Sequence, residues 1–372
     1  MIIYFTGCIL ISIKFLIVGS NTRAISKSLY ELGYTVYATS FFKLIDQMSY
    51  VEKLIVPDSI HSFDLKVLED LALEYVNEVD YIICSSDVDV SRFPKTKIVG
   101  NKKTDDITDK YKMYKKLHKN FLMPLTFKVS SASEAEEIVD NYPLKKFITK
   151  PIKGTGGFGI SWFNRQKEYD NPFILQEFIE GDSVSSSFLA HPDHDISMIT
   201  TSNQIIGSSL LGVSDFVYCG NVTPLVNSSP KLVNISRKIS RMFRLLGNNG
   251  ADFIMHNKNV YVIEVNPRIP GTFECVEKSF NVNMAKAHID SCNNNQVNIP
   301  HVEKFTVKLV PFALNDAYYN LSGIDGVYDI SSDKNIIKKS YPISSIITSD
   351  RILENAMTKA EIIRKKVYNS KI

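Results

Sequence analysis

Three oxygen-bearing side chains fall at a spacing that could bind a metal ion. Asp252 and Glu264 each interrupt an apolar run, Ala251–Met255 and Val260–Val265, and the runs flank a His-Asn-Lys-Asn turn. This pattern predicts a β-hairpin. With the turn centred on Lys258, the two acids are equally far from it. They should therefore pair across adjacent strands with both side chains on one face.

Like charges in directly opposed positions destabilise a hairpin unless a cation lies between them. Asn266 follows Glu264 by two residues and adds a third oxygen on the same face, because side chains alternate along a strand. Such a set of hard oxygen ligands suits Mg²⁺ or Mn²⁺, with nucleotide phosphate oxygens completing the shell. The alternative is a surface hairpin with one solvated carboxylate on each strand.

A glycine-rich loop is the second chemical feature. It contains Gly154, Gly156, Gly157 and Gly159 and follows a strand expected over 145–151 that carries Lys150. The spacing satisfies G-x-G-x-x-G, but a strand-like I-S-W-F segment follows where a dinucleotide site needs a helix, and no G-K-[ST] closes a Walker loop. A glycine hairpin between two strands can instead fold its backbone N–H groups over phosphates.

Together with this loop, Asp252 and the E-V-N-P-R segment from Glu264 to Arg268 resemble the metal-binding end of the ATP-grasp superfamily. That superfamily includes biotin carboxylase, D-alanine–D-alanine ligase and small archaeal carboxylate–amine ligases. The resemblance implies that Asp252, Glu264 and Asn266 bind Mg²⁺ ions which bridge the phosphates of ATP. It also implies that Arg268 stabilises charge at the transferring phosphoryl group or the bound carboxylate.

The same resemblance implies a nucleotide-binding set elsewhere in the chain. Lys110, in an Asp-Lys pair, matches a lysine that reaches the ATP phosphates, and Lys150 matches the lysine that precedes the glycine flap. In the superfamily, the backbone of a hinge segment binds the adenine edge. The positions that match this hinge are Gln176, Glu177, Phe178 and Ile179. The residue that holds the ribose is left open among Ser183, Glu180 and Asp182.

The implied reaction is transfer of a phosphoryl group from Mg-ATP to a small carboxylate, followed by capture of the acyl phosphate by an amine to give an amide and ADP. No protein nucleophile is needed, in agreement with the lack of a Ser-His-Asp or Cys-His pattern. Two alternatives stay open. One is ATP-dependent carboxylation through carboxyphosphate, and the other is a non-catalytic ATP-binding regulatory protein.

The fold class that goes with this resemblance is α/β and α+β, an ATP-grasp fold. We expect an amino-terminal Rossmann-like domain over 14–103, the ATP-grasp domain over 104–300 and a small carboxy-terminal α+β segment over 301–372. Apolar periodicity supports a βαβ opening, with strands at 15–19, 34–38 and 81–84 and a helix over 67–76. It also predicts a helix over 232–246, short strands at 305–310, 326–330, 336–339 and 343–347, and a last helix over 351–367.

Three polar segments could contribute to a substrate pocket. Ser20, Asn21 and Arg23 follow the first strand, where ligands bind in open α/β sheets, although helix capping is the alternative reading. The segment 218–224 is expected to be an irregular loop. The segment 270–272, directly after Arg268, could bind a carboxylate through backbone N–H groups.

Composition favours an ordinary globular protein. Apolar residues make up 44% of the chain, charged residues 22%, and the formal net charge is +3. That charge gives no reason to expect a nucleic-acid or membrane partner, so we expect small-molecule acid and amine partners and leave a homodimer open. Five scattered cysteines without a C-x-x-C pair are typical of reduced thiols, and indicate a cytoplasmic protein.

The first thirteen residues are strongly apolar up to Lys14. They lack the basic region and cleavage site of a signal peptide, and they are too short for a membrane span. We expect a non-essential extension here, with a membrane anchor as the alternative.

Overall fold

An amino-terminal parallel sheet begins the fold. The computed structural model describes residues 12–58, 63–154, 156–170, 172–226, 229–331 and 335–372, so residues 1–11 of the expected extension lie outside it. The sheet has the order β3-β2-β1-β4, and all its neighbours are parallel. Its strands are β1 (Lys14–Val18), β2 (Thr35–Thr39), β3 (Lys53–Ile55) and β4 (Tyr81–Cys84), with helices α1 (Arg23–Tyr30) and α2 (Leu65–Leu73). The expected βαβ opening is confirmed.

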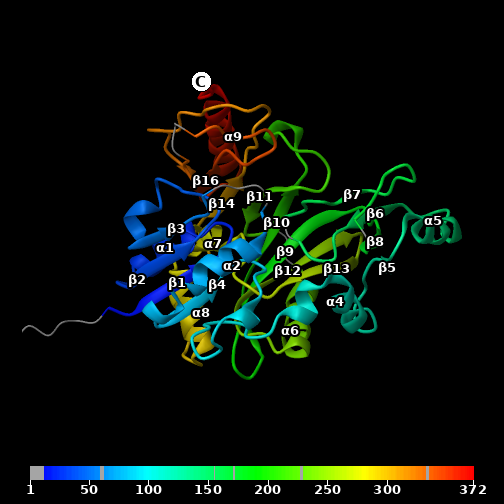
Figure 1. Cartoon of the computed structure of the whole chain (residues 1–372), viewed down its shortest axis with the longest axis horizontal. Helices are drawn as coiled ribbons and strands as arrows, with labels where there is room; N and C mark the ends of the chain where they lie inside the picture. Colours follow the sequence, from blue (N-terminus) through cyan, green and yellow to red (C-terminus); the bar gives the residue numbers. More distant parts are fainter. Residues whose placement is uncertain (1–11, 59–62, 155, 171, 227–228, 332–334) are drawn as a thin grey trace, which may run out of the picture.

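A small antiparallel sheet lies at the opposite end of the molecule, on the right of Figure 1. It has the order β5-β8-β6-β7, with strands β5 (Thr126–Val129), β6 (Phe147–Lys150), β7 (Ser161–Trp162) and β8 (Phe173–Glu177). Helices α3 (Asp105–Thr108) and α4 (Lys110–Leu117) precede it, and α5 (Ala132–Asn141) connects two of its strands. The glycine loop joins β6 to β7, as expected.

An eight-stranded sheet runs through the middle of the molecule in the order β13-β12-β9-β10-β11-β14-β16-β15. Its strands are β9 (Asp182–Ala190), β10 (Ile196–Ile206), β11 (Tyr218–Thr223), β12 (Gly247–His256), β13 (Asn259–Asn266), β14 (Phe305–Leu309), β15 (Val327–Tyr328) and β16 (Ser345–Asp350). Helices α6 (Pro230–Phe243), α7 (Phe273–Phe280), α8 (Met284–Cys292) and α9 (Leu353–Asn369) pack around it. Strands β14, β15 and β16 near the carboxyl end of the chain thus continue the sheet that carries the predicted metal ligands.

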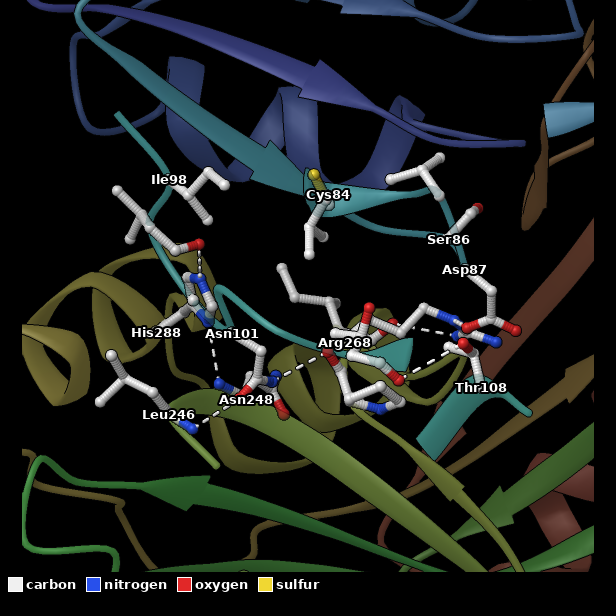
Figure 2. Close-up of a pocket in the computed structure, with 17 residues that line it drawn as sticks. Cys84, Ser86, Asp87, Ile98, Asn101, Thr108, Leu246, Asn248, Arg268 and His288 are labelled. Carbon is white, nitrogen blue, oxygen red and sulfur yellow. Dashed lines mark hydrogen bonds and ion pairs between the residues drawn. The ribbon is translucent and has the colours of Figure 1, made fainter. Parts of the chain in front are cut away.

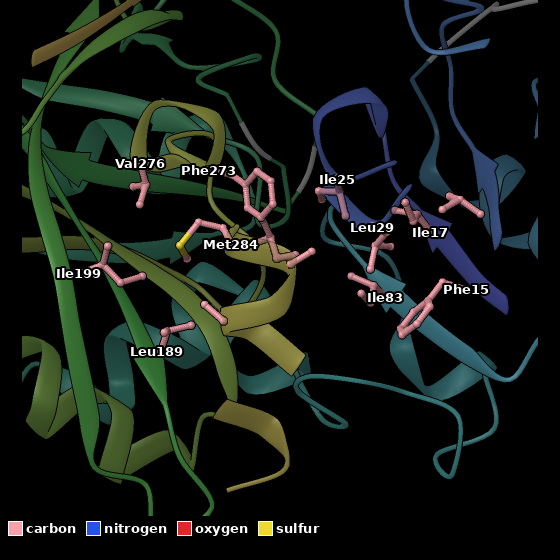
Figure 3. Packing of buried hydrophobic residues seen from close by; sticks show 14 of the residues in the cluster. Phe15, Ile17, Ile25, Leu29, Ile83, Leu189, Ile199, Phe273, Val276 and Met284 are labelled. Atoms are coloured by element: carbon pink, nitrogen blue, oxygen red, sulfur yellow. The ribbon is translucent and has the colours of Figure 1, made fainter. Parts of the chain in front are cut away.

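A shared apolar core fixes the amino-terminal sheet against the rest of the chain. Figure 3 shows Phe15 and Ile17 of β1 on one side, with Phe273 and Met284 of α7 and α8 on the other. Each of these four side chains is less than 4% exposed. Burying an apolar side chain of this size stabilises the folded state by about 1.5–3 kcal/mol, so this contact holds the two parts in a fixed relation.

Several predicted boundaries differ from the structure. The segment 218–224 was predicted as a loop because it is polar, and that prediction is wrong. Most of the segment is β11, an interior strand. The strand expected at 336–339 is wrong, since Ile337 makes only an isolated bridge to Ala317. The helix expected over 67–76 is α2, which ends at Leu73 and is followed by a short 3₁₀ helix, Val76–Glu78. Further 3₁₀ helices are Met48–Tyr50, Val90–Arg92 and Ser209–Leu211.

Two expectations about chain chemistry can be checked on the described residues. Cys84, Cys219, Cys275 and Cys292 are all unpaired thiols, and Cys8 lies outside the described part. Within that part, no helix combines the length and the apolar character needed to cross a membrane.

Candidate functional site

The hairpin of β12 and β13 places Asp252 directly opposite Glu264, as the sequence predicts. The tight turn is Asn257–Lys258, half a residue away from the expected centre. A β-bulge between Asp252 and Phe253 restores the expected pair: Phe253 faces Val262, whereas Asp252 faces Glu264.

The bulge decides which way Glu264 points. Val260 and Val262 are buried in the core under the sheet, and strict alternation would send Glu264 into the same core. Because β13 has one extra residue there, Val265 returns to the core. Glu264 and Asn266 instead line the cavity on the opposite face together with Asp252.

Amide groups hold the Asp252 carboxylate in place. The side chain of Gln204 donates to one of its oxygens at 2.9 Å, and that of Asn266 donates to the other at 2.9 Å. Burial, and after it the like charge of Glu264, raises the pKa of Asp252 to about 6. The acid is therefore fixed in position while its charge lacks a full counterion.

Lys110 connects the hairpin to the glycine loop. Its ammonium lies 2.9 Å from Glu264 Oε1 and donates to the carbonyl of Gly154 at 2.6 Å. Lys110 begins α4, which is capped by the side chain of Asp109. The expected Asp-Lys pair therefore consists of the cap and the first residue of the helix.

Lys150 lies at the end of β6 and is 7% exposed. Burial lowers the pKa of its ammonium to about 8, although Glu264 acts in the opposite direction. A buried lysine whose charged form is disfavoured is stabilised by any anion that enters the cavity. Lys150, Asp252 and Glu264 thus line one cavity, and Lys110 is joined to it through its ion pair with Glu264.

The glycine loop closes over this space against β11. Gly156 accepts a hydrogen bond from the Tyr218 N–H at 3.1 Å. Gly157, with φ of 80°, lies so near the chain at Phe216 that a Cβ there would be 1.9 Å from the Phe216 carbonyl oxygen. Glycine is required at this position by both the backbone angle and the close approach.

The expected hinge follows β8 and lines the same cavity. Gln176 donates its side-chain amide to Thr126 at 2.9 Å. The N–H groups of Glu177 and Phe178 already donate to Leu125 and Lys146, each at 2.8 Å. Of the hinge N–H groups beyond β8, only that of Ile179 has no partner among the described residues.

The cavity between hinge, glycine loop and hairpin has a volume of about 540 Å³. Its hinge end is aromatic, since the rings of Trp162 and Phe178 lie 4.7 Å apart and that of Phe216 lies 5.3 Å from Trp162. Its other end holds the charged cluster. A flat apolar base at one end and phosphates at the other would match this distribution. Ser183 also lines the cavity, whereas the roles of Glu180 and Asp182 stay open.

Arg268 closes the charged end of the cavity and connects it to the amino-terminal sheet. Its Nε donates to Asp87 at 2.7 Å, and both side chains are 13% exposed. Figure 2 shows the two side chains pointing toward each other, from the segments after β13 and β4. A further nitrogen of Arg268 lies 3.3 Å from the Asn266 side-chain oxygen.

The donor set fits a hard divalent cation. Asp252, Glu264 and Asn266 supply only oxygen ligands, and a cation between the two carboxylates would relieve their repulsion. Within the described chain, no cluster of three or more His, Cys, Asp and Glu side chains could hold a metal. An ion here would therefore need the Asn266 oxygen and oxygens from a bound ligand.

Sequence reasoning missed two polar partners, Asp87 and Gln204. Asp87 is 181 positions from Arg268 in the chain, although its place just after a parallel strand was a usable signal. Gln204 lies on β10, two strands from the hairpin, and nothing in its neighbourhood in the sequence distinguishes it. The aromatic residues Trp162 and Phe216 were also missed, because nothing in their local sequence distinguishes them from other aromatic residues of the chain.

Comparisons with known proteins agree with this geometry. Residues 107–272 match the model of the ATP-grasp domain family. An uncharacterised protein of Methanocaldococcus jannaschii is 31% identical over 368 residues, which cover 94% of this chain and 91% of that protein. Tyramine–L-glutamate ligase of the same organism is 26% identical, over 72% of this chain and 86% of the ligase.

A solved structure shows the same fold across the chain. Carboxyaminoimidazole ribonucleotide synthase from Aspergillus clavatus, complexed with ATP, superposes with a TM-score of 0.73. The alignment covers 96% of this chain and 99% of that one at 12% identity, so it concerns the fold alone. The expected fold class is confirmed.

Proposed function

Because the chain belongs to the ATP-grasp family, we propose that it is an ADP-forming carboxylate–amine ligase. It would phosphorylate a small carboxylic acid with ATP and couple the acyl phosphate to an amine. The observation that carries this proposal is the charged cluster of Lys110, Lys150, Asp252 and Glu264 at one end of a nucleotide-sized cavity.

At the phosphate end, each charged residue has a distinct task. Lys150 would pair with phosphate oxygens, an interaction that restores the charge its burial disfavours. Lys110 would also pair with phosphate oxygens once it leaves Glu264. Asp252, Glu264 and Asn266 would hold Mg²⁺ or Mn²⁺, which neutralises charge between the β- and γ-phosphates.

At the other end, the hinge would bind adenine. Ile179 has the N–H group free to donate to the base, and the rings of Trp162, Phe178 and Phe216 offer apolar surface to it. The glycine loop, with Gly154, Gly156 and Gly157, would cover the phosphates and exclude water.

Arg268 would stabilise the transferring phosphoryl group. Its guanidinium lies beside Asn266, at the edge between the charged cluster and the space beyond it. Fixed positive charge at this point lowers the barrier because it needs no reorganisation when charge shifts to the accepting oxygen.

The test is whether ADP release needs two substrates. Purified protein with Mg-ATP is incubated with acids and amines, separately and together, beginning with amino acids and aromatic amines, as the name of the related tyramine–L-glutamate ligase suggests. The proposal expects ADP only when an acid and an amine are both present. Release that depends on bicarbonate would instead indicate a carboxylase. Tight ATP binding without any release would indicate a regulatory protein.

A further inference from the structure

A second cavity, of about 340 Å³, lies on the far side of Arg268. It shares Arg268, Pro270 and Gly271 with the nucleotide cavity, so the two spaces meet there. Its walls come from the carboxyl ends of β1 and β4, from α7, and from β14 and the segment entering β16. Ser20, Asn21 and Arg23, which the sequence analysis named as residues that could touch a ligand, line this cavity.

The acidic side chains of this cavity already have partners. Arg23 donates to both oxygens of Glu274, at 2.9 and 2.6 Å, and to Asp329 at 2.8 Å. Asp329 also accepts a hydrogen bond from Ser345. Because these oxygens are occupied within the protein, they offer no ready site for an ammonium group of a ligand.

Two hydrogen-bond donors of this cavity lack an acceptor within the described part of the chain. The Lys308 ammonium makes no hydrogen bond or salt bridge with the described residues, although its charge helps to lower the pKa of Asp329. Ser344 is 3% exposed, and its hydroxyl has no hydrogen-bond partner. A buried hydroxyl without a partner destabilises the folded protein, so a ligand that hydrogen-bonds it is favoured.

Lys308 and Ser344 both line this cavity. Lys308 pairs with Ile347 across β14 and β16, and side chains that oppose each other lie on the same face. Ser345 is two residues before Ile347 and therefore shares that face, whereas Ser344 lines the cavity from the segment that enters β16. An anionic group could accept from Lys308 and Ser344 together.

We infer that this cavity binds a carboxylic acid that carries a second anionic group. The inference rests on the proposed ligase function: the reacting carboxylate lies at Arg268, next to the nucleotide, and the second anion lies on Lys308 and Ser344. That second group is a carboxylate or a phosphate ester, because both offer the oxygen acceptors that an ammonium and a hydroxyl need.

The experiment is a calorimetric titration of acids into the full chain, with and without Mg²⁺ and adenylyl imidodiphosphate. Succinate, glutarate and adipate are each compared with the monocarboxylate of equal length, and 3-phosphoglycerate with glycerate. We expect one dianionic class to bind at least about tenfold more tightly than its monoanionic partner, the effect of one charge-assisted hydrogen bond. A preference within the dicarboxylate pairs identifies the second group as a carboxylate, and a preference for 3-phosphoglycerate over glycerate identifies it as a phosphate ester.

Two variants assign the preference to the site. Lys308→Met should abolish it, and Ser344→Ala should reduce it, while both still bind the nucleotide analogue. Lys304→Met is the matched control, since Lys304 is exposed directly before β14 and lines a different cavity. It should leave the preference unchanged.

The inference is overturned if no dianionic acid is preferred, or if the preference survives Lys308→Met. Failure of the ligase proposal gives a different result. The nucleotide analogue would then not bind, or no ADP would form with any acid and amine. Either result is independent of the affinities of the acids measured without nucleotide.

Discussion

Two buried charge clusters lie on either side of Arg268, and their protonation equilibria shift in opposite directions. Around Arg23, burial lowers the pKa of the guanidinium, but Asp329 and Glu274 outweigh it and the pKa stands well above its usual value. The pKa of Asp329 is held below its usual range by Arg23 despite burial. Around the hairpin, burial dominates, so Lys150 falls to a pKa of about 8 and Asp252 rises to about 6.

This difference in pKa shifts distinguishes a cluster that stabilises the fold from a cluster suited to bind a ligand. In the Arg23 cluster, Glu274 and Asp329 are hydrogen-bonded to Arg23 inside the protein, whereas at Asp46, 3.4 Å away, burial raises the pKa. It joins the amino-terminal sheet, α7 and the segment after β15. The hairpin cluster keeps its charges poorly matched, which is what a site for a triphosphate and a cation requires.

Breaking the Arg23 cluster should give the largest loss of stability. Arg23→Met leaves Glu274 and Asp329 buried without their counterion, and we expect the free energy of unfolding to fall by about 3–5 kcal/mol. Urea denaturation measures it. Adding Glu274→Leu should recover part of the loss, because it removes one stranded charge. An unchanged unfolding midpoint in Arg23→Met would show that the cluster is not structural.

At the hairpin cluster, Glu264→Gln should affect chemistry and not the fold. It keeps the volume and removes a charge that would bind the metal, so ADP release should fall by at least about 100-fold. Circular dichroism and the unfolding midpoint should stay near those of the unaltered chain. Glu354→Gln, an exposed acid in the first turn of α9, is the control. Normal turnover in Glu264→Gln would contradict the proposed metal site.

Arg268 lies between the two clusters, and Asp87 sets its position. Asp87→Asn keeps a hydrogen-bond acceptor but removes the charge 2.7 Å from Nε. We expect kcat to fall by about tenfold with the KM for ATP unchanged, because the guanidinium would no longer be held in one orientation. Steady-state kinetics with saturating acid and amine measure this. A change only in the KM for ATP would place Arg268 in nucleotide binding instead.

The smallest effect should appear in the pH dependence of nucleotide affinity. Lys150 carries its charge below a pKa of about 8 and loses it above, so the affinity for ATP should fall as pH rises through that value. Between pH 7.5 and 9 the expected decrease is up to about tenfold. In Lys150→Arg, which stays charged, the decrease should disappear. An affinity that is flat with pH in the unaltered chain would contradict the assignment.

Local patterns in the sequence predicted much of the site. Asp252, Glu264 and Asn266 were found because polar residues in apolar strands require an explanation, and Lys150 because it precedes a glycine-rich turn. The structure brings all of them to one cavity. Their roles in binding stay predictions.

Contacts between distant segments were out of reach. Asp87 meets Arg268, and Lys308 meets the second cavity, only because strands pair in a particular order. The strand β11 was predicted as a loop because its C-G-N-V-T sequence is polar, whereas it is an interior strand whose Asn221 side chain donates to Thr223 at 2.9 Å. Single-sequence periodicity has no signal for polar residues that are satisfied by one another.

The bulge in β13 has a consequence for how this hairpin can change over generations. Its single extra residue keeps Glu264 and Asn266 facing outward while the valines on both sides face inward. If the bulge were lost while Ile263 was kept, strict alternation would exchange these two faces, and would bury an acid while expelling Val265. Deletion of Ile263 itself would restore strict alternation with Glu264 still facing outward, so the hairpin can lose this residue together with the bulge but cannot lose the bulge alone.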